Sequence, residues 1–286
     1  MEIKVGTRGS DLALVQTKSV VSDLKSCHPN AEVEIETIKT SGDLKSKPFG
    51  DGVFVKEIDM AVLDGEIDIG VHSLKDEPTD LPEGLNLGCV PERLNQCDVL
   101  IAKEGNNLRE LKKGSLIGTG SPRRKREIGR LRAGLNFKNI RGNIPTRIEK
   151  VENGEYDALV TSYAAVDRMD LKGKISQKFD FKEVVPAAGQ GALGVVCRSG
   201  EEEKLKLDKL NDEEKYLQTS CERSFLRELG LGCRSGVGAV AEVEDEYLRL
   251  FGVLNEEGKE RLTVKMEGED PIELGKRAWE VIKNER

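Results

Sequence analysis

The sequence predicts an α/β protein that ends in a small α+β domain. Strand and helix patterns alternate through the first two thirds of the chain, which is typical of layered α/β folds with largely parallel sheets. After residue 198 the pattern changes to a charged helical stretch and then to strands. At about 150 residues per domain, a length of 286 residues leaves room for two domains or three small ones.

The elements of the first part follow from periodicity and from capping residues. Strands are expected at residues 3–5, 32–38, 67–71, 116–118, 137–140 and 157–161. Helices are expected from Ser10 past Leu24, over 53–63, from Ser121-Pro122 onward, and from Pro145 to Gly154. Ser10 and Ser121 suit the N-cap position because a serine oxygen accepts a hydrogen bond from the first helical turn.

The last part of the chain has a different order of elements. Residues 200–229 read as charged helix, and residues 237–243, 247–253 and 261–266 read as three strands. Asp270-Pro271 is expected to begin a final helix over 272–282. Clusters of Pro and Gly near 78–84 and 186–194 are candidate linkers or hinges.

Charge is distributed unevenly along the chain. The protein has 45 Lys and Arg against 52 Asp and Glu, which gives a net charge of -7. Residues 105–150 nevertheless carry 13 basic and 3 acidic residues. A basic segment in an acidic protein predicts a particular anionic ligand rather than general attraction to nucleic acid.

Several classes of protein are excluded or disfavoured. No apolar run approaches the roughly 18 residues that span a bilayer, and the N-terminus enters a strand pattern instead of a secretory signal. The six cysteines include no C-x-x-C pair, so reduced thiols in the cytoplasm are expected. His28 and His72 have no acidic partners at ligand spacing, so no metal site is expected and His72 is interpreted as structural.

Arginines mark the candidate ligand site. Each of five arginines lies just after an expected strand or at a helix start, namely Arg8, Arg123, Arg124, Arg141 and Arg147. Ligands of open α/β sheets bind at the carboxyl ends of strands, and a guanidinium group grips a carboxylate or phosphate with two hydrogen bonds. The pattern therefore predicts a polyanionic ligand. Arg126, Arg130 and Arg132 are expected on a solvated helix face.

Two further positions could carry chemistry. Lys75 and Asp76 follow a buried strand, either as a surface ion pair or as a site in which Asp76 faces a positively charged intermediate. Cys233 lies in a glycine-rich turn beside Arg234, a setting that lowers the pKa of a thiol. Cys89, Cys97 and Cys197 are expected in the core.

Seven motifs in this order resemble the porphobilinogen deaminase (hydroxymethylbilane synthase) family. They are Val5-Gly6-Thr7-Arg8-Gly9-Ser10-Asp11-Leu12-Ala13-Leu14, Phe54-Val55-Lys56-Glu57, Val71-His72-Ser73-Leu74-Lys75-Asp76, Gly118-Thr119-Gly120-Ser121-Pro122-Arg123-Arg124, Arg141-Gly142-Asn143 with Thr146-Arg147, Gly189-Gln190-Gly191-Ala192, and Gly232-Cys233. The resemblance runs from residue 3 to about 240.

The resemblance implies two lobes of the type II periplasmic-binding-protein fold with mixed sheets and a small C-terminal α+β domain. Domain 1 is expected over 1–96 with 191–215 returning to it, domain 2 over 97–190, and domain 3 over 216–286. The family joins four porphobilinogen molecules head to tail with loss of ammonia and releases a linear tetrapyrrole by hydrolysis. The protein is expected to act as a cytoplasmic monomer that binds no metal, membrane or nucleic acid.

The resemblance also assigns roles to residues. Cys233 is expected to hold a dipyrromethane cofactor through a thioether, and Asp76 is expected to stabilise the cationic azafulvene and pyrrolenine intermediates. Cofactor and substrate carboxylates are expected to contact Arg8, Ser10, Lys75, Thr119, Ser121, Arg123, Arg124, Arg141, Arg147, Arg168 and Gln190.

The chain departs from the family pattern at a few positions. Leu231 and Gly236 replace a glycine and a proline around Cys233, Gly120 replaces a serine, and Gly9 and Asp11 differ beside Arg8. Two alternatives stay open at this point. One is a non-catalytic, two-lobed binding protein for a small organic anion. The other is nucleic-acid binding by residues 105–150, which the scarcity of aromatic residues disfavours.

Overall fold

The computed structural model describes residues 1–40, 55–230, 236–245 and 247–286. The chain forms two compact units. The first comprises Met1–Arg93 and Ala192–Leu217, and the second comprises Leu94–Gly191 and Gln218–Arg286. Residues 94–191 of the second unit thus interrupt the first unit, and the chain returns to the second unit at residue 218. The division into three domains stays a prediction.

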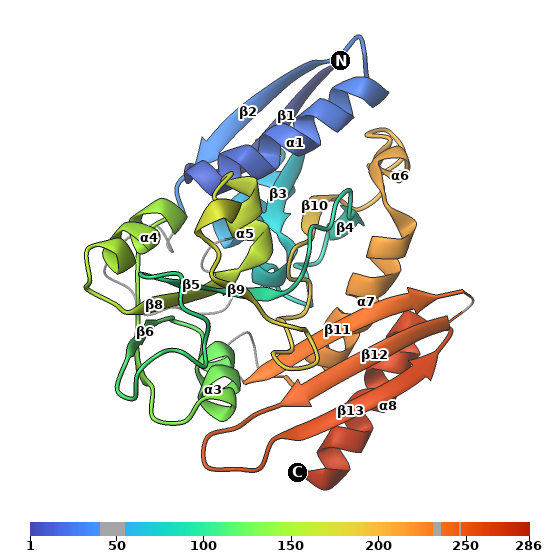
Figure 1. Ribbon diagram of the computed structural model, residues 1–286. Helices are drawn as coiled ribbons and strands as arrows, with labels where there is room; N and C mark the ends of the chain where they lie inside the picture. The colour runs from blue at the N-terminus through green and yellow to red at the C-terminus, as the bar shows by residue number, and fades with distance from the viewer. Residues whose placement is uncertain (41–54, 231–235, 246) are drawn as a thin grey trace. The chain divides into compact units, whose positions relative to one another are not determined.

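The first unit is built on a mixed five-stranded sheet (Figure 1). Its strands run in the order β2-β1-β3-β10-β4, with β1, β2 and β3 parallel and β10 antiparallel to β3 and β4. The elements are β1 Glu2–Arg8, α1 Asp11–Cys27, β2 Glu32–Ile38, α2 Lys56–Leu63, β3 Ile69–Ser73, the 3-10 turn Leu74–Asp76, β4 Leu85–Cys89, β10 Leu193–Arg198 and α6 Leu207–Leu210.

Helices cover both faces of this sheet. Val195 and Val196 are neighbours on β10, so their side chains point to opposite faces. Val195 joins the core cluster that contains Leu24 of α1, and Val196 joins the cluster that contains Ile58 of α2. The sheet is therefore buried between α1 and α2, and its functional side chains lie at its edges.

The second unit repeats the plan of the first. Its sheet has the order β7-β6-β8-β5-β9, with β6, β7 and β8 parallel and β5 antiparallel to β8 and β9. The elements are β5 Asp98–Ala102, β6 Leu116–Gly118, α3 Pro122–Leu131, β7 Asn136–Lys138, α4 Ile144–Glu152, β8 Ala158–Ser162, α5 Tyr163–Arg168, the 3-10 turn Lys172–Lys174 and β9 Gln177–Lys178.

The expectation of largely parallel sheets is wrong. In both sheets an antiparallel strand that comes from elsewhere in the chain, β10 or β5, lies beside the parallel trio. Periodicity indicates that a segment is a strand but does not identify its partner. The α/β fold class, with mixed sheets in two units and a small C-terminal α+β part, is confirmed.

The C-terminal part of the second unit is a three-stranded antiparallel sheet with helices packed on it (Figure 1). Its elements are α7 Glu213–Arg227, which enters this unit at Gln218, β11 Val237–Glu244, β12 Tyr247–Leu254, β13 Leu262–Gly268 and α8 Pro271–Glu285. The rings of Phe225 and Trp279 meet edge to face at 6.2 Å between centroids, joining α7 to α8. Asp270 caps α8, as expected, by accepting a hydrogen bond from the Glu273 N–H at 2.7 Å. Across the described ranges, no helix is both long and apolar enough to span a bilayer.

Candidate active site

Two helices begin at corresponding places in the two sheets. Ser10 follows β1, and its Oγ accepts a hydrogen bond from the Ala13 N–H at 3.3 Å. Ser121 follows β6, and its Oγ accepts one from the Arg124 N–H at 3.3 Å. Both predicted N-caps are confirmed. Because β1 and β6 are the middle strands of parallel trios, each unit presents a helix N-terminus, which attracts anions, at the carboxyl edge of its sheet.

Arg8 and Thr119 lie two residues before these serines and so occupy equivalent positions. Arg8 is the last residue of β1 and is half-buried. Thr119 directly follows β6, and its Oγ1 accepts a hydrogen bond from the Ser121 N–H at 3.3 Å. Each helix N-terminus therefore has a further polar side chain beside it.

The turn after β3 carries Lys75 and Asp76. Its backbone is fixed on the sheet side, because the Leu74 N–H donates to the Ala192 carbonyl at 3.0 Å and the Leu74 side chain is fully buried. The side chains of Lys75 and Asp76 are half-buried. Since β1 and β3 are parallel neighbours, this ammonium and carboxylate lie at the same sheet edge as the start of α1.

Asp98 organises a buried ion network in the second unit. Arg123 NH1 lies 2.8 Å from Asp98 Oδ2, and Arg124 donates from Nε to Asp98 Oδ1 at 2.9 Å. Burial alone would raise the pKa of Asp98, but the two guanidinium groups hold it well below its usual range. One carboxylate between two guanidinium groups leaves a positive charge in excess at the start of α3.

Gln190 completes this network. Its Nε2 donates to Asp98 Oδ1 at 2.9 Å and to the Gln96 carbonyl at 2.6 Å, and its Oε1 accepts from Arg124 NH2 at 3.1 Å. Arg168, at the end of α5, donates from NH2 to the Gly191 carbonyl at 3.0 Å. The loop around Gln190 is thus held to both α3 and α5.

Arg141 and Arg147 lie on either side of the start of α4. Arg141 is exposed in the loop after β7, and Arg147 donates from Nε to the Gly142 carbonyl at 2.7 Å. Asn143 caps the helix, its Oδ1 accepting from the Thr146 N–H at 2.9 Å. Because β7 is parallel to β6, both arginines lie at the sheet edge where α3 begins.

Cys233, the expected point of cofactor attachment, and Leu231 lie outside the described residues. Gly236, which replaces a proline of the family pattern, is described and buried. A Cβ added to Gly236 would collide with the Asn255 carbonyl oxygen, and the Asn255 N–H donates to the Gly236 carbonyl at 3.0 Å. The close contact with the Asn255 backbone therefore explains why position 236 has a glycine in place of the proline.

His72 has acidic partners that the sequence analysis missed. Its Nε2 lies 3.2 Å from Asp59 Oδ1 on α2, and its Nδ1 lies 3.7 Å from Glu77 Oε2 after the 3-10 turn. All three side chains are buried and could in principle hold a metal ion. The expectation of no acidic partners was wrong because Asp59 is distant in sequence and reaches His72 only through the packing of α2.

The interpretation of Arg126, Arg130 and Arg132 as a solvated face holds for Arg130, which is exposed, and needs correction for Arg126 and Arg132, which are half-buried. These side chains donate hydrogen bonds to the backbone carbonyls of Asn255, Glu183 and Leu111 respectively, at 2.7, 2.6 and 3.1 Å. A guanidinium group has five N–H donors, so it can satisfy loop carbonyls that secondary structure leaves unpaired. These arginines therefore hold loops of the second unit.

The buried cysteines are core residues, as expected. Cys89, Cys97 and Cys197 are at most 6% exposed. Burial raises the pKa of the Cys197 thiol to about 12 and raises the pKa of Cys89 further above its usual range. Thiols with raised pKa values are poor nucleophiles at neutral pH.

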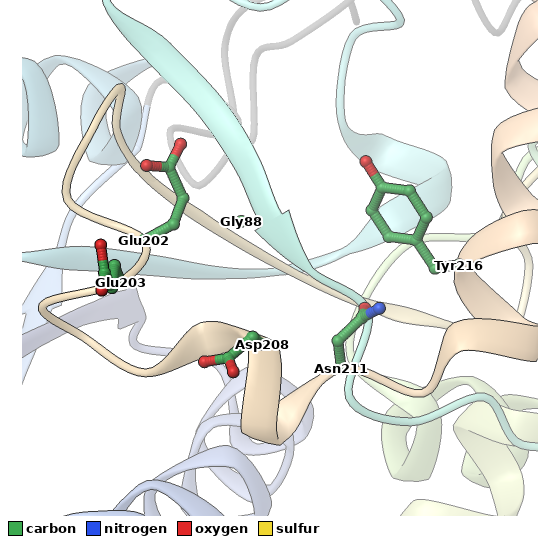
Figure 2. A pocket seen from close by; sticks show the side chains of 6 residues that line it. All are labelled: Gly88, Glu202, Glu203, Asp208, Asn211 and Tyr216. Atoms are coloured by element: carbon green, nitrogen blue, oxygen red, sulfur yellow. The ribbon is translucent and has the colours of Figure 1, made fainter.

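A pocket of about 360 Å³ in the first unit is lined by none of the predicted site residues. Figure 2 shows the residues that line it, which are Gly88, Glu202, Glu203, Asp208, Asn211 and Tyr216. Asn86 donates a hydrogen bond to Glu202 at 2.7 Å and thereby lowers the pKa of Glu202. Three carboxylates make this pocket unsuitable for a polyanion.

Solved structures of binding proteins resemble the chain weakly. The methionine-binding protein MetQ is 14% identical, with a TM-score of 0.48, and the match covers 75% of this chain and 92% of that chain. The effector-binding domain of BenM with benzoate is 13% identical, with a TM-score of 0.46, and the match covers 73% of this chain and 90% of that domain.

Sequence comparisons give a closer match. The family model of "Porphobilinogen deaminase, dipyromethane cofactor binding domain" matches residues 3–206, and that of "Porphobilinogen deaminase, C-terminal domain" matches residues 216–284. Porphobilinogen deaminase of Thermus thermophilus is 45% identical over 96% of this chain and 92% of its own length. Porphobilinogen deaminase of Brevibacillus brevis is 42% identical over 98% of this chain and 93% of its own length. A probable porphobilinogen deaminase of Archaeoglobus fulgidus is 40% identical over 96% of this chain and 97% of its own length. The chain belongs to the porphobilinogen deaminase family.

Proposed function

We propose that this chain is a hydroxymethylbilane synthase, a transferase of tetrapyrrole and heme biosynthesis. It joins four porphobilinogen molecules head to tail, releases one ammonia at each addition, and frees the linear tetrapyrrole by hydrolysis. The observation that carries the proposal is membership of the family over nearly the whole chain, with 45% identity to the Thermus thermophilus relative over 278 residues.

The charge of the chain supports this substrate. Porphobilinogen carries an acetate and a propionate, so each addition brings two further carboxylates. The second unit offers the excess positive charge at Arg123 and Arg124, with Thr119 and Ser121 at the start of α3. The remaining proposed carboxylate contacts are Arg8, Ser10, Lys75, Arg141, Arg147, Arg168 and Gln190.

The residues present fit the family's dipyrromethane cofactor. Its acidic side chains require cationic and N–H donors. The start of α1 provides both beside Arg8 in the first unit, and the start of α3 provides both beside Arg124 in the second unit. A dipyrromethane bound through a thioether to Cys233 supplies the free pyrrole carbon at which chain growth begins. Cys233 provides the sulfur, and the basic residues hold the acid groups in place.

Asp76 is proposed as the catalytic residue. A carboxylate held in a fixed place stabilises positive charge that develops nearby and accepts hydrogen bonds from N–H groups. Porphobilinogen develops such a charge when ammonia leaves, and its pyrrole N–H is a suitable donor to Asp76. The burial of Leu74 supports this role, because it fixes the turn and limits movement of the Asp76 carboxylate. Lys75 binds a substrate carboxylate beside it.

Intact-protein mass spectrometry together with an ammonia-release assay tests the proposal. The purified protein is expected to be heavier than its sequence by two linked pyrrole units and to release ammonia from porphobilinogen. Cys233→Ser is expected to lose the added mass, whereas the control Cys27→Ser, which changes a free cysteine of the first unit, keeps it. A native protein without the added mass and without ammonia release contradicts the proposed function.

We also propose that the protein acts as a cytoplasmic monomer, without a metal or nucleic acid. The net charge of -7 and the 4% aromatic content oppose nucleic-acid binding. The free thiols among the described cysteines suit a reducing compartment. Light scattering after gel filtration should give the mass of one chain, and a dimer mass contradicts the proposal.

A further inference from the structure

A buried group of three ionisable side chains lies beneath the turn that carries Lys75 and Asp76. It consists of His72 on β3, Asp59 on α2 and Glu77 directly after the turn, and we call it the His72 clasp. Each of the three residues is at most 4% exposed. Ionisable groups are rarely buried unless they are paired, so the arrangement requires an explanation.

The local sequence makes room for the imidazole ring. Gly70 precedes His72 by two residues, so both lie on the same face of β3. A Cβ on Gly70 would lie 2.8 Å from His72 Nε2 and 2.9 Å from the Ile58 side chain. The absence of a side chain at Gly70 therefore lets the ring lie under α2, with Nε2 facing Asp59.

The two carboxylates lie at opposite nitrogens of the ring. Asp59 Oδ1 is 3.2 Å from Nε2, and Glu77 Oε2 is 3.7 Å from Nδ1. An imidazolium has an N–H at each nitrogen and can serve both carboxylates. A metal ion bound through one ring nitrogen would draw both carboxylates toward that nitrogen, whereas here their nearest oxygens approach different nitrogens of the ring. The geometry favours the imidazolium.

The clasp also closes the turn. His72 and Glu77 flank the segment 73–76, so their ion pair joins the two ends of the loop that carries Lys75 and Asp76. The backbone supports this closure, because the Glu77 N–H donates to the Leu74 carbonyl at 3.2 Å. We propose that His72 is held as an imidazolium between Asp59 and Glu77, and that this clasp positions the Asp76 carboxylate. The positioning role rests on the proposed function of Asp76.

The surrounding charges agree with a protonated ring. Burial lowers the pKa of His72, but the negative charges of Glu77, Asp59 and Asp76 outweigh it, so the pKa is raised above 6.5. The residue of β10 opposite His72 is Gly194, which brings no charge. The clasp therefore stabilises the fold fully below pH 6.5, and this stabilisation is lost as the pH rises above 6.5 through the folded-state pKa.

Nitrogen NMR of the holoenzyme, with labelled histidine, tests the charge state. The chain has two histidines, so a His72 signal can be assigned with few ambiguities. His72 is expected to be mostly imidazolium, with a proton on each ring nitrogen, at pH 6.5, and the midpoint of its titration is expected above 6.5. Glu77→Gln and Asp59→Asn should each lower that midpoint. A ring that is mostly neutral at pH 6.5, or a stoichiometric divalent metal found by elemental analysis, overturns the proposal.

Kinetics of the same variants test the positioning role. Glu77→Gln is expected to lower kcat by about tenfold or more with little change in KM, because a displaced catalytic group slows the reaction without weakening binding. The fall of kcat at high pH should also begin at lower pH. Asp68→Asn, which breaks an ion pair with Arg198 in the same unit, is the control and should leave the kcat–pH profile unchanged.

The outcomes separate this inference from the proposed function. An unaltered kcat and pH profile in Glu77→Gln, in an active wild-type background, overturns the positioning role alone. A wild-type protein that releases no ammonia removes the proposed function and the positioning role together. The NMR titration of His72 still decides its charge state in that case.

Discussion

Asp76 lies at the end of a short turn whose backbone is hydrogen-bonded to the sheet, so its carboxylate has little freedom to move. Asp76→Asn keeps the size of the side chain but removes the negative charge. We expect turnover to fall by about 100-fold or more, because charge stabilisation and proton handling typically contribute that much. The rate of ammonia release measures this effect.

A nearby carboxylate provides the control for Asp76. Asp80 is exposed and lies four residues further along the chain. Asp80→Asn makes the same chemical change outside the turn and should keep normal turnover. Equal rates for the wild type and Asp76→Asn would remove Asp76 from the mechanism.

Gly236 is expected to be intolerant of any side chain. A Cβ at this position would collide with the Asn255 carbonyl oxygen, and Arg126 NH1, which donates to that oxygen at 2.7 Å, would also be in the way. Gly236→Ala should lower the free energy of unfolding by about 1–3 kcal/mol, the usual range for overpacking. Gly173→Ala, where no atom lies within 4 Å, should change it by no more than about 0.5 kcal/mol. Urea denaturation measures the free energy of unfolding of both variants, and an equal loss in the two would contradict the packing argument.

At the scale of elements, the sequence predicted the features that depend on neighbouring residues, such as the starts of helices. The serine caps of α1 and α3 and the aspartate cap of α8 are confirmed, because capping depends on residues within one helical turn. The insertion of β10 between β3 and β4 could not be derived from periodicity, because its partners lie more than a hundred residues away. The same limit hid the Asp98 network, in which Gln190 is 92 residues from its partner.

Asp98 joins three elements of the second unit, since β5 carries it, α3 carries its arginine partners and the Gln190 loop donates to it. Asp98→Asn removes the negative charge that Asp98 places between two guanidinium groups, each at most 11% exposed. We expect a loss of about 3–5 kcal/mol in the free energy of unfolding at pH 7, as for other broken buried ion pairs.

The pH dependence of stability gives the Asp98 prediction a second readout. A lowered folded-state pKa means that the carboxylate stabilises the fold at pH values above its ordinary 3.8. This stabilisation is lost as the pH falls below that value toward the folded-state pKa. The free energy of unfolding should therefore fall more between pH 5 and pH 3 for the wild type than for Asp98→Asn. Parallel losses in the two proteins would contradict the assignment.

At the scale of the whole molecule, two sheets of the same strand plan each present basic and polar side chains at their carboxyl edges. The sequence shows no repeat that would reveal this likeness. Buried strands such as β3 and β8 form the interior of the two sheets. The segment 105–150 has 13 basic and 3 acidic residues in a chain of net charge -7. Attraction of an acidic substrate therefore depends on where these charges lie.

The affinity for porphobilinogen is expected to depend on ionic strength. The Debye length falls from about 10 Å at 0.1 M salt to about 3 Å at 1 M, so added salt should raise KM while kcat changes little. Arg141→Gln removes an exposed charge at the carboxyl edge of the second sheet and should raise KM and flatten its salt dependence. Arg109→Gln removes the same charge from the loop that precedes β6, at the opposite edge, and should alter neither. Steady-state kinetics at several salt concentrations measures these effects. Equal changes in the two variants would mean that the total charge of the segment, rather than its placement at the strand ends, attracts the substrate.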